Sequence, residues 1–195
     1  MNVQLTEKIE SIFRHTLLLI KDQGFHGTPM SQIAKASHVA IGTIYHYFPS
    51  KDNLIIELHH YCKQIIYQYI FQNIDETLTY KEQFFVVFKH FCLFHLERTD
   101  ISKFLEQFYG SPYYEMIRDS QSAIQQEENR VLSFLLKGME LNLLKQVEPH
   151  ILCNAYIGAA LSYSKTVMYG KVKYDEQQLQ DLTEIIWNGV KNNNI

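Results

Sequence analysis

A six-residue segment that begins at Gly42 carries side chains able to bind phosphate and base edges. Thr43, Tyr45 and Tyr47 supply hydroxyl groups, and His46 supplies an imidazole. Hydroxyls of this kind donate hydrogen bonds to phosphate oxygens and to polar atoms in a nucleic-acid groove. Gly42 has no side chain, so the backbone can approach a bound molecule closely at that point. The segment therefore predicts a short recognition element.

The flanking residues predict two short helices joined by a turn. Thr28-Pro29 is a helix start, because threonine caps free amides and proline is tolerated in the first turn. A turn at 37–39 and a stop at Pro49 bound the second short helix. Ser50 is expected to cap a further helix at about 50–72. This is the layout of a helix-turn-helix.

Apolar residues recur at steps of three and four along the rest of the chain, without a credible strand pattern. The other helices are expected at about 5–23, 79–97, 101–110, 112–140, 149–169 and 175–191. The predicted fold class is all-α, with about nine helices. A three-helix DNA-binding head would occupy residues 1–49. A second, helical domain would occupy 50–195, joined to the head by the helix at about 50–72; the family resemblance described below implies that it binds a ligand and dimerises.

Composition argues against several functional classes. The three cysteines, Cys62, Cys92 and Cys153, are far apart, which fits a reducing compartment better than a disulfide framework. No apolar run approaches the ~20 residues that cross a membrane, so a cytoplasmic protein without a membrane partner is expected. The pairs His59/Cys62 and Cys92/His95 supply only two ligands each, so no metal site is expected. No cofactor or catalytic motif is recognisable, and an enzyme is not expected.

The segment from Gly42 to Leu54 resembles the signature of the TetR family of bacterial transcriptional regulators, with Ile33-Ala34-Lys35-Ala36 and Gly24-Phe25 at the usual spacing upstream. The strong match covers about 9–58. The resemblance implies a ligand-responsive, DNA-binding homodimer: a repressor released from a palindromic operator by a small effector. The resemblance implies that DNA is contacted by Thr28, Gly42, Thr43, Tyr45, His46, Tyr47 and Lys51. We add the neighbouring Ile41 to this set of DNA-contacting residues.

Three positions depart from the family pattern. Ala40 replaces a frequent serine, so a helix cap is expected to be missing. Ile41 replaces a frequent basic residue, and an apolar side chain there suggests contact with a thymine methyl group. His38 replaces the turn glycine and is expected to adopt left-handed geometry. Residues 1–60 also carry equal numbers of basic and acidic side chains, although DNA-binding heads are usually basic. The alternative is therefore a helical small-molecule-binding protein of the same fold that has lost DNA binding.

The middle of the chain is unusually aromatic. For any single ring, ordinary core packing is the simplest interpretation, but an aromatic wall with a few polar groups also suits a ligand cavity. The resemblance implies an effector pocket in these helices, for a largely apolar or aromatic molecule such as a lipophilic drug, a fatty acyl species or a planar cation. The candidate ligand-binding residues are Phe88, Phe91, His95, Phe104, Phe108, Tyr109 and Tyr113.

Small residues at close spacing in the last two predicted helices favour close helix approach. This suits a four-helix dimer bundle, which is the arrangement that the resemblance implies. The alternative is that these helices only complete the core of the monomer. The candidate dimer-interface residues are Leu152, Ala155, Tyr156, Ala159, Tyr163, Leu182 and Ile186.

Overall fold

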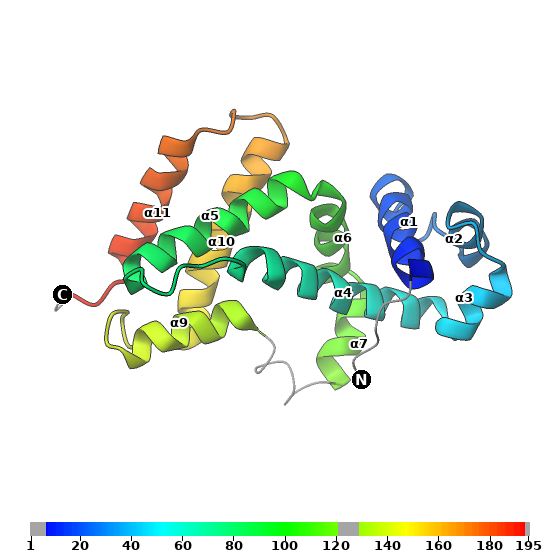
Figure 1. Cartoon of the computed structure of the whole chain (residues 1–195), viewed down its shortest axis with the longest axis horizontal. Helices are drawn as coiled ribbons and strands as arrows, with labels where there is room; N and C mark the ends of the chain where they lie inside the picture. The colour runs from blue at the N-terminus through cyan, green and yellow to red at the C-terminus, as the bar shows by residue number, and fades with distance from the viewer. Residues whose placement is uncertain (1–6, 121–128, 194–195) are drawn as a thin grey trace. The chain divides into compact units, whose positions relative to one another are not determined.

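A computed structural model describes residues 7–120 and 129–193 of the chain. This part is mainly helical (Figure 1), which confirms the all-α prediction. Its ten helices are α1 (Glu7–Gln23), α2 (Met30–Ala36), α3 (Ile41–Tyr47), α4 (Lys51–Phe71), α5 (Tyr80–Glu97), α6 (Thr99–Tyr109), α7 (Pro112–Ser120), α9 (Arg130–Glu140), α10 (Pro149–Met168) and α11 (Glu176–Val190). The β-type pairing in these residues is one isolated antiparallel bridge between Leu144 and Lys191.

The chain divides into two compact units. Unit 1 comprises residues 1–64 and 98–120, and unit 2 comprises residues 65–97 and 121–195. Helix α4 contributes residues to both. The sequence predicts a domain boundary after residue 49, whereas this division by compactness places α6 and α7 with the N-terminal helices.

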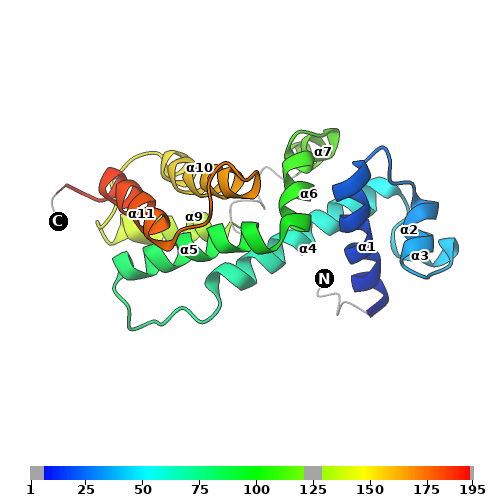
Figure 2. The ribbon, with the colours of Figure 1, turned by 90° about the horizontal axis from the view of Figure 1, so that it is seen from above.

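Helix α6 belongs with the N-terminal helices because it packs against α1, as both views of the ribbon show (Figures 1 and 2). The Gln107 side chain donates to the Ile20 carbonyl at 3.2 Å, at the end of α1. The rings of Phe25 and Phe104 meet edge to face, with centroids 5.9 Å apart. These contacts join residues far apart in sequence, and local patterns in the sequence cannot reveal them.

Helix α1 buries the predicted stripe, including Ile12, Phe13 and Leu17. Each such side chain contributes about 1.5–3 kcal/mol when fully buried. The helix ends before Gly24, which has the left-handed φ of +70° expected of a residue at that position.

The expected cap at Thr28 is wrong. Its buried hydroxyl donates to the Gly24 carbonyl at 2.8 Å, and the residue flanking α2 is Pro29, without a side-chain cap. A threonine hydroxyl can donate as well as accept, and here the preceding turn uses the donor. The cap at Ser50 is confirmed, because the Asn53 amide donates to Ser50 Oγ at 3.1 Å.

Unit 2 has an aromatic core. Helix α5 contacts both α10 and α11 (Figure 2). The Phe84 ring meets Tyr156 at 4.6 Å and Trp187 at 5.1 Å, both edge to face. The buried Tyr156 hydroxyl donates to the Phe84 carbonyl at 2.7 Å. These rings fill the space between the helices, and the buried hydroxyl of Tyr156 is hydrogen-bonded.

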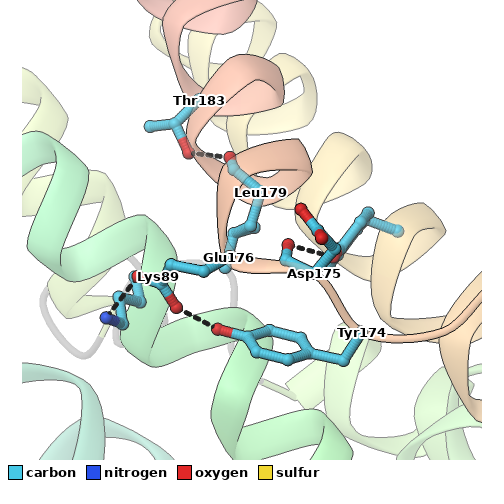
Figure 3. Close-up of polar contacts among 7 residues, drawn as sticks. Lys89, Tyr174, Asp175, Glu176, Leu179 and Thr183 are labelled. Carbon is cyan, nitrogen blue, oxygen red and sulfur yellow. Dashed lines mark hydrogen bonds and ion pairs between the residues drawn. The ribbon is translucent and has the colours of Figure 1, made fainter.

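The start of α11 is fixed by side chains. Asp175 accepts from the Gln178 amide at 2.8 Å, which confirms the predicted cap (Figure 3). Such a cap contributes about 1 kcal/mol. Glu176 pairs with Lys89 of α5 at 2.6 Å and accepts from the Tyr174 hydroxyl. This exposed pair contributes little energy, and it joins two helices that already pack against each other.

The predicted helix at 112–140 corresponds to α7 and α9, and residues 121–128 lie outside the described part. Likewise, the predicted start of the first helix at residue 5 lies outside it. Among the described residues, no helix is both long enough and apolar enough to span a membrane.

Candidate nucleic-acid interface

Helix α3 packs against the protein through one face, and its other faces are partly or fully exposed. Ile44 is fully buried, and Phe48 is buried directly after the helix. Ile41 and Tyr45 are 42% and 49% exposed, although both are large side chains with apolar rings or branches. Together with the exposed Gly42 between them, these side chains leave a surface of α3 that is accessible to another molecule.

Gly42 has no packing role among the residues that the structure describes. A Cβ placed there would meet no heavy atom within 4 Å. By contrast, a Cβ at Gly138 in unit 2 would clash with the Tyr80 ring, so that glycine is required by the fold. Gly42 therefore leaves open space on the surface of α3, beside the exposed His46 and the half-buried Thr43.

The turn before α3 has the predicted geometry. His38 has a left-handed φ of +56°, and the Val39 amide donates to the Ala34 carbonyl at 3.1 Å. Ala40 flanks α3 without a side-chain cap, which confirms that expectation. The unsatisfied amides at the start of α3 accordingly stay available to an anion or to water.

Tyr47 is half-buried and lies beside the residues that anchor α3. Its ring is 5.3 Å from His46 and 6.4 Å from Phe48. Phe48 in turn contacts Phe13 of α1 at 5.4 Å. Tyr47 thus joins the packing of α3 and keeps part of its surface accessible.

Two of the predicted DNA contacts are engaged inside unit 1. Thr28 is fully buried, and both its hydroxyl and its amide donate to carbonyls of the preceding turn. The Lys51 ammonium donates to the Phe25 carbonyl. Burial lowers the pKa of Lys51, while Asp52 acts in the opposite direction. In this conformation both residues hold the α1–α2 turn.

The predicted ligand-binding residues are divided between the units. In unit 1, Phe104 and Phe108 are fully buried and Tyr109 is 50% exposed, while the Tyr113 ring contacts Phe25 at 5.1 Å.

In unit 2, Phe88 packs edge to face on Tyr156 at 5.1 Å, and Phe91 lies 4.9 Å from His95. Burial, followed by Lys165, lowers the pKa of His95 to about 4. Most of these rings therefore have core neighbours.

The predicted dimer residues differ in exposure. Leu152 and Tyr156 are buried in unit 2, Ala155 is exposed, and the others are half-buried. They are Ala159, Tyr163, Leu182 and Ile186. The predicted set does not include Ile151 and Ile185 of the same helices, which are 59% and 66% exposed.

The steps of three and four in Ile151–Ala155–Gly158–Ser162 place these residues on one face of α10. This spacing is visible in the sequence and could have pointed to Ile151. A Cβ placed at Gly158 would also meet nothing within 4 Å.

Within the described residues, no group of three or more His, Cys, Asp or Glu side chains is placed to hold a metal ion. All three cysteines are buried and unbonded to each other. Burial raises the pKa of the Cys92 thiol to about 12 and that of Cys62 further. Neither is a reactive thiolate.

Comparison with known proteins agrees with this geometry. Residues 12–58 match the family described as bacterial regulatory proteins, tetR family. A Haemophilus influenzae protein named an uncharacterized HTH-type transcriptional regulator is 31% identical over 112 residues, 57% of this chain and 60% of the relative. The fatty acid metabolism regulator protein of Bacillus subtilis is 36% identical over 94 residues, 46% of this chain and 47% of the relative. The chain therefore matches less than two thirds of the length of these relatives.

Solved structures extend the likeness to the whole fold. A TetR family transcription regulator from Marinobacter aquaeolei has a TM-score of 0.83 at 18% identity, over 95% of this chain and 96% of that one. A TetR-family regulator from Haemophilus influenzae has a TM-score of 0.80 at 24% identity, over 95% and 97%. At these identities the likeness establishes the fold. Residues 12–58 thus match the tetR family of bacterial regulatory proteins, and the chain has the fold of the solved TetR-family structures.

Proposed function

We propose that the protein is a homodimeric transcriptional regulator that binds a palindromic operator through α3 and releases it when a small, largely apolar effector binds. The observation that carries the proposal is the surface of α3. One buried isoleucine anchors a helix whose Ile41, Gly42, Tyr45 and His46 face solvent. The names of its relatives, one an HTH-type transcriptional regulator and the other a fatty acid metabolism regulator protein, support the same function.

Within this proposal, residues 1–49 read DNA, and residues 50–195 bind the effector and dimerise. Contacts to DNA come from Ile41, Thr43, Tyr45, His46 and Tyr47. Lys51 and Thr28 contribute indirectly, because their hydrogen bonds stabilise the α1–α2 turn that precedes α2 and α3. The regulator acts as a repressor in the cytoplasm.

Gly42→Ala tests the interface directly. The added methyl meets nothing within 4 Å in the described part of the chain, so we expect the protein to fold, but the methyl fills the space where the backbone approaches DNA. We expect operator affinity to fall at least about tenfold, equivalent to ~1.4 kcal/mol, in a gel shift on the DNA upstream of its own gene.

Gly110→Ala is the matched control, because a Cβ there makes only ordinary contacts at 3.8 Å and lies outside α3. Equal operator affinity of the two variants would contradict the proposed use of α3.

The exposed face of α10 and α11 is the proposed dimer surface. It presents Ile151, Ile185, Ala155 and Gly158, whose small or apolar side chains allow close helix approach. A dimer is also what an operator with two half-sites requires. We expect Ile185→Asp to convert the dimer to monomer by light scattering at micromolar concentration, while Val172→Asp, in the exposed α10–α11 loop, leaves it dimeric. A monomeric wild-type protein would overturn this assignment.

The proposed effector is largely apolar, and a fatty acyl species is the first class to test, given the name of the Bacillus subtilis relative. The coupling between effector and operator is limited to the effector's differential affinity for the two states, usually about 1–3 kcal/mol. If operator affinity stays constant in saturating acyl-CoA and free fatty acid, fatty acyl species are excluded as the effector.

The second candidate is a small-molecule-binding protein without DNA binding. It is favoured by the internal engagement of Lys51 and Thr28 and by the equal numbers of charges in residues 1–60. The two candidates separate in one measurement, because only the first predicts a saturable gel shift at moderate salt.

A further inference from the structure

The interior of unit 1 contains a histidine whose polar atoms are unpaired. His59 lies in α4 and is 5% exposed. Neither Nδ1 nor Nε2 has a hydrogen-bond partner in the part of the chain that the structure describes. A buried polar atom without a partner costs free energy, and the exceptions in native proteins are commonly explained by a water or a bound molecule.

Comparable polar side chains in this protein are paired. Thr16 donates to the Ile12 carbonyl at 2.7 Å, and the His90 ring bonds the Ile70 carbonyl at 3.0 Å. Ser164 donates to the Ala160 carbonyl at 2.8 Å. Among the described side chains, the only other buried polar atom without a partner is the hydroxyl of Ser37. His59 is thus exceptional, and packing alone does not account for its two nitrogens.

The surroundings of His59 are aromatic. Its ring stacks on Phe108 of α6, with centroids 4.2 Å apart and planes 10° apart. Tyr109 meets it edge-on at 6.0 Å and itself contacts Tyr114 of α7 at 5.3 Å. Phe108 is fully buried, whereas Tyr109 is 50% exposed, so the aromatic wall reaches the surface at Tyr109. Such a wall suits an apolar or aromatic body.

The state of the imidazole determines which polar group it can bind. Burial, followed by the charges of Lys63 and His60, lowers the pKa of His59 to about 3. The ring is therefore neutral at physiological pH, with one N–H donor and one acceptor nitrogen. A cation would gain no ion pair from it and would meet Lys63 and His60. A hydroxyl group both donates and accepts, and it matches the neutral ring.

We propose that His59 is the polar anchor of a small-molecule site in unit 1, which takes a hydroxyl group carried on an apolar or aromatic body packed against Phe108 and Tyr109. Residue Gln107, next to Phe108, holds the end of α1 through the Ile20 carbonyl. An occupant that displaces Phe108 therefore acts on the helix that supports α2 and α3. This link to DNA reading rests on the proposed function, whereas binding at His59 does not.

The test uses full-length protein without DNA, labelled with ¹⁵N-histidine. Phenol and 1-hexanol are the probes, and toluene is the control of similar size without a hydroxyl. We expect phenol or hexanol to move the Nδ1 and Nε2 signals of His59 in a saturable way, and toluene to leave them unchanged. Ring nitrogens that stay unchanged up to the solubility of both alcohols, or that remain bound to an internal water, would overturn the proposal.

Two matched variants separate this role from packing. His59→Phe removes two unpaired atoms and keeps the stack on Phe108, so we expect Tm to rise by about 2–4 °C and alcohol binding to be lost. His90→Phe removes a satisfied hydrogen bond in unit 2, so we expect Tm to fall and alcohol binding to persist. Equal phenol affinity of wild type and His59→Phe, by calorimetry, would show that the site lies elsewhere. Should His59→Phe fold poorly, the wild-type titration still decides the question.

Discussion

Two tyrosines show how differently the head and the core of unit 2 use one residue type. Tyr45 on α3 is 49% exposed, whereas Tyr156 on α10 is 1% exposed and donates to the Phe84 carbonyl at 2.7 Å. Both sit on helices rich in apolar residues. The difference lies in which helix face meets other helices, so the same ring serves as an interface on α3 and as core on α10.

The largest expected effect comes from truncating each of the two tyrosines in turn. We expect Tyr156→Ala to lower the free energy of unfolding by about 3–5 kcal/mol, because it leaves a cavity among aromatic rings and removes a buried hydrogen bond. We expect Tyr45→Ala to change it by less than about 1 kcal/mol and to weaken operator binding instead. Urea denaturation and a gel shift on both variants measure the two effects. A large stability loss in Tyr45→Ala would mean that its ring belongs to the core.

Acidification should destabilise the protein through its buried histidines. The folded pKa of His59 is about 3, below the unfolded value of 6.5, so the unfolded state binds the extra proton first. The stability that depends on the neutral ring is complete above pH 6.5 and is lost progressively between pH 6.5 and 3. From pH 6.5 to 5 the loss from His59 is about 2 kcal/mol.

His95, with a folded pKa of about 4, acts in the same direction in unit 2. Urea midpoints between pH 7 and 5 measure the slope, and His59→Phe should flatten it by the His59 share. An unchanged slope in that variant would show that His59 is hydrated in solution.

Lys51 distinguishes a structural role from a phosphate contact. Because its ammonium donates to the Phe25 carbonyl, we expect Lys51→Met to cost about 1 kcal/mol of stability. The slope of log affinity against log salt should stay the same, since no phosphate contact is lost. A slope reduced by about one would instead return Lys51 to the DNA-contacting set.

The smallest expected effect concerns Ile41. Its exposed side chain suits a thymine methyl, and removal of such a contact costs at most about 1 kcal/mol. Wild type should therefore bind an operator with uracil in place of thymine a few times more weakly, while Ile41→Ala binds both equally. A similar preference for thymine in both proteins would exclude this contact.

Local chemistry made much of the fold predictable. Gly24, His38 and Gly170 adopt the left-handed geometry of residues that end helices or turns. Ser50 and Asp175 cap helices as their types suggest. These outcomes depend on a residue and its neighbours within a few positions, which is the range that a sequence pattern describes.

Thr28 shows the limit of such patterns. Its position before a proline favours a cap, but its hydroxyl has two uses, and the Gly24 carbonyl one turn back takes it. For Lys51, too, the partner that competes with DNA is a carbonyl 26 residues away. Spacing along the chain does not reveal such partners.

The sequence by itself determined the helix-turn-helix, the all-α class and the exposed chemistry of α3, because periodicity and turn residues act locally. Only the tertiary structure decided that α6 packs on α1, that most of the aromatic residues of α5 and α6 are buried against other rings, and that His59 lies buried without a hydrogen-bond partner among the described residues. Each of these depends on which helix faces meet across long stretches of chain. The physical reason is that burial is a property of the packed assembly of helices, and a single helix does not specify it.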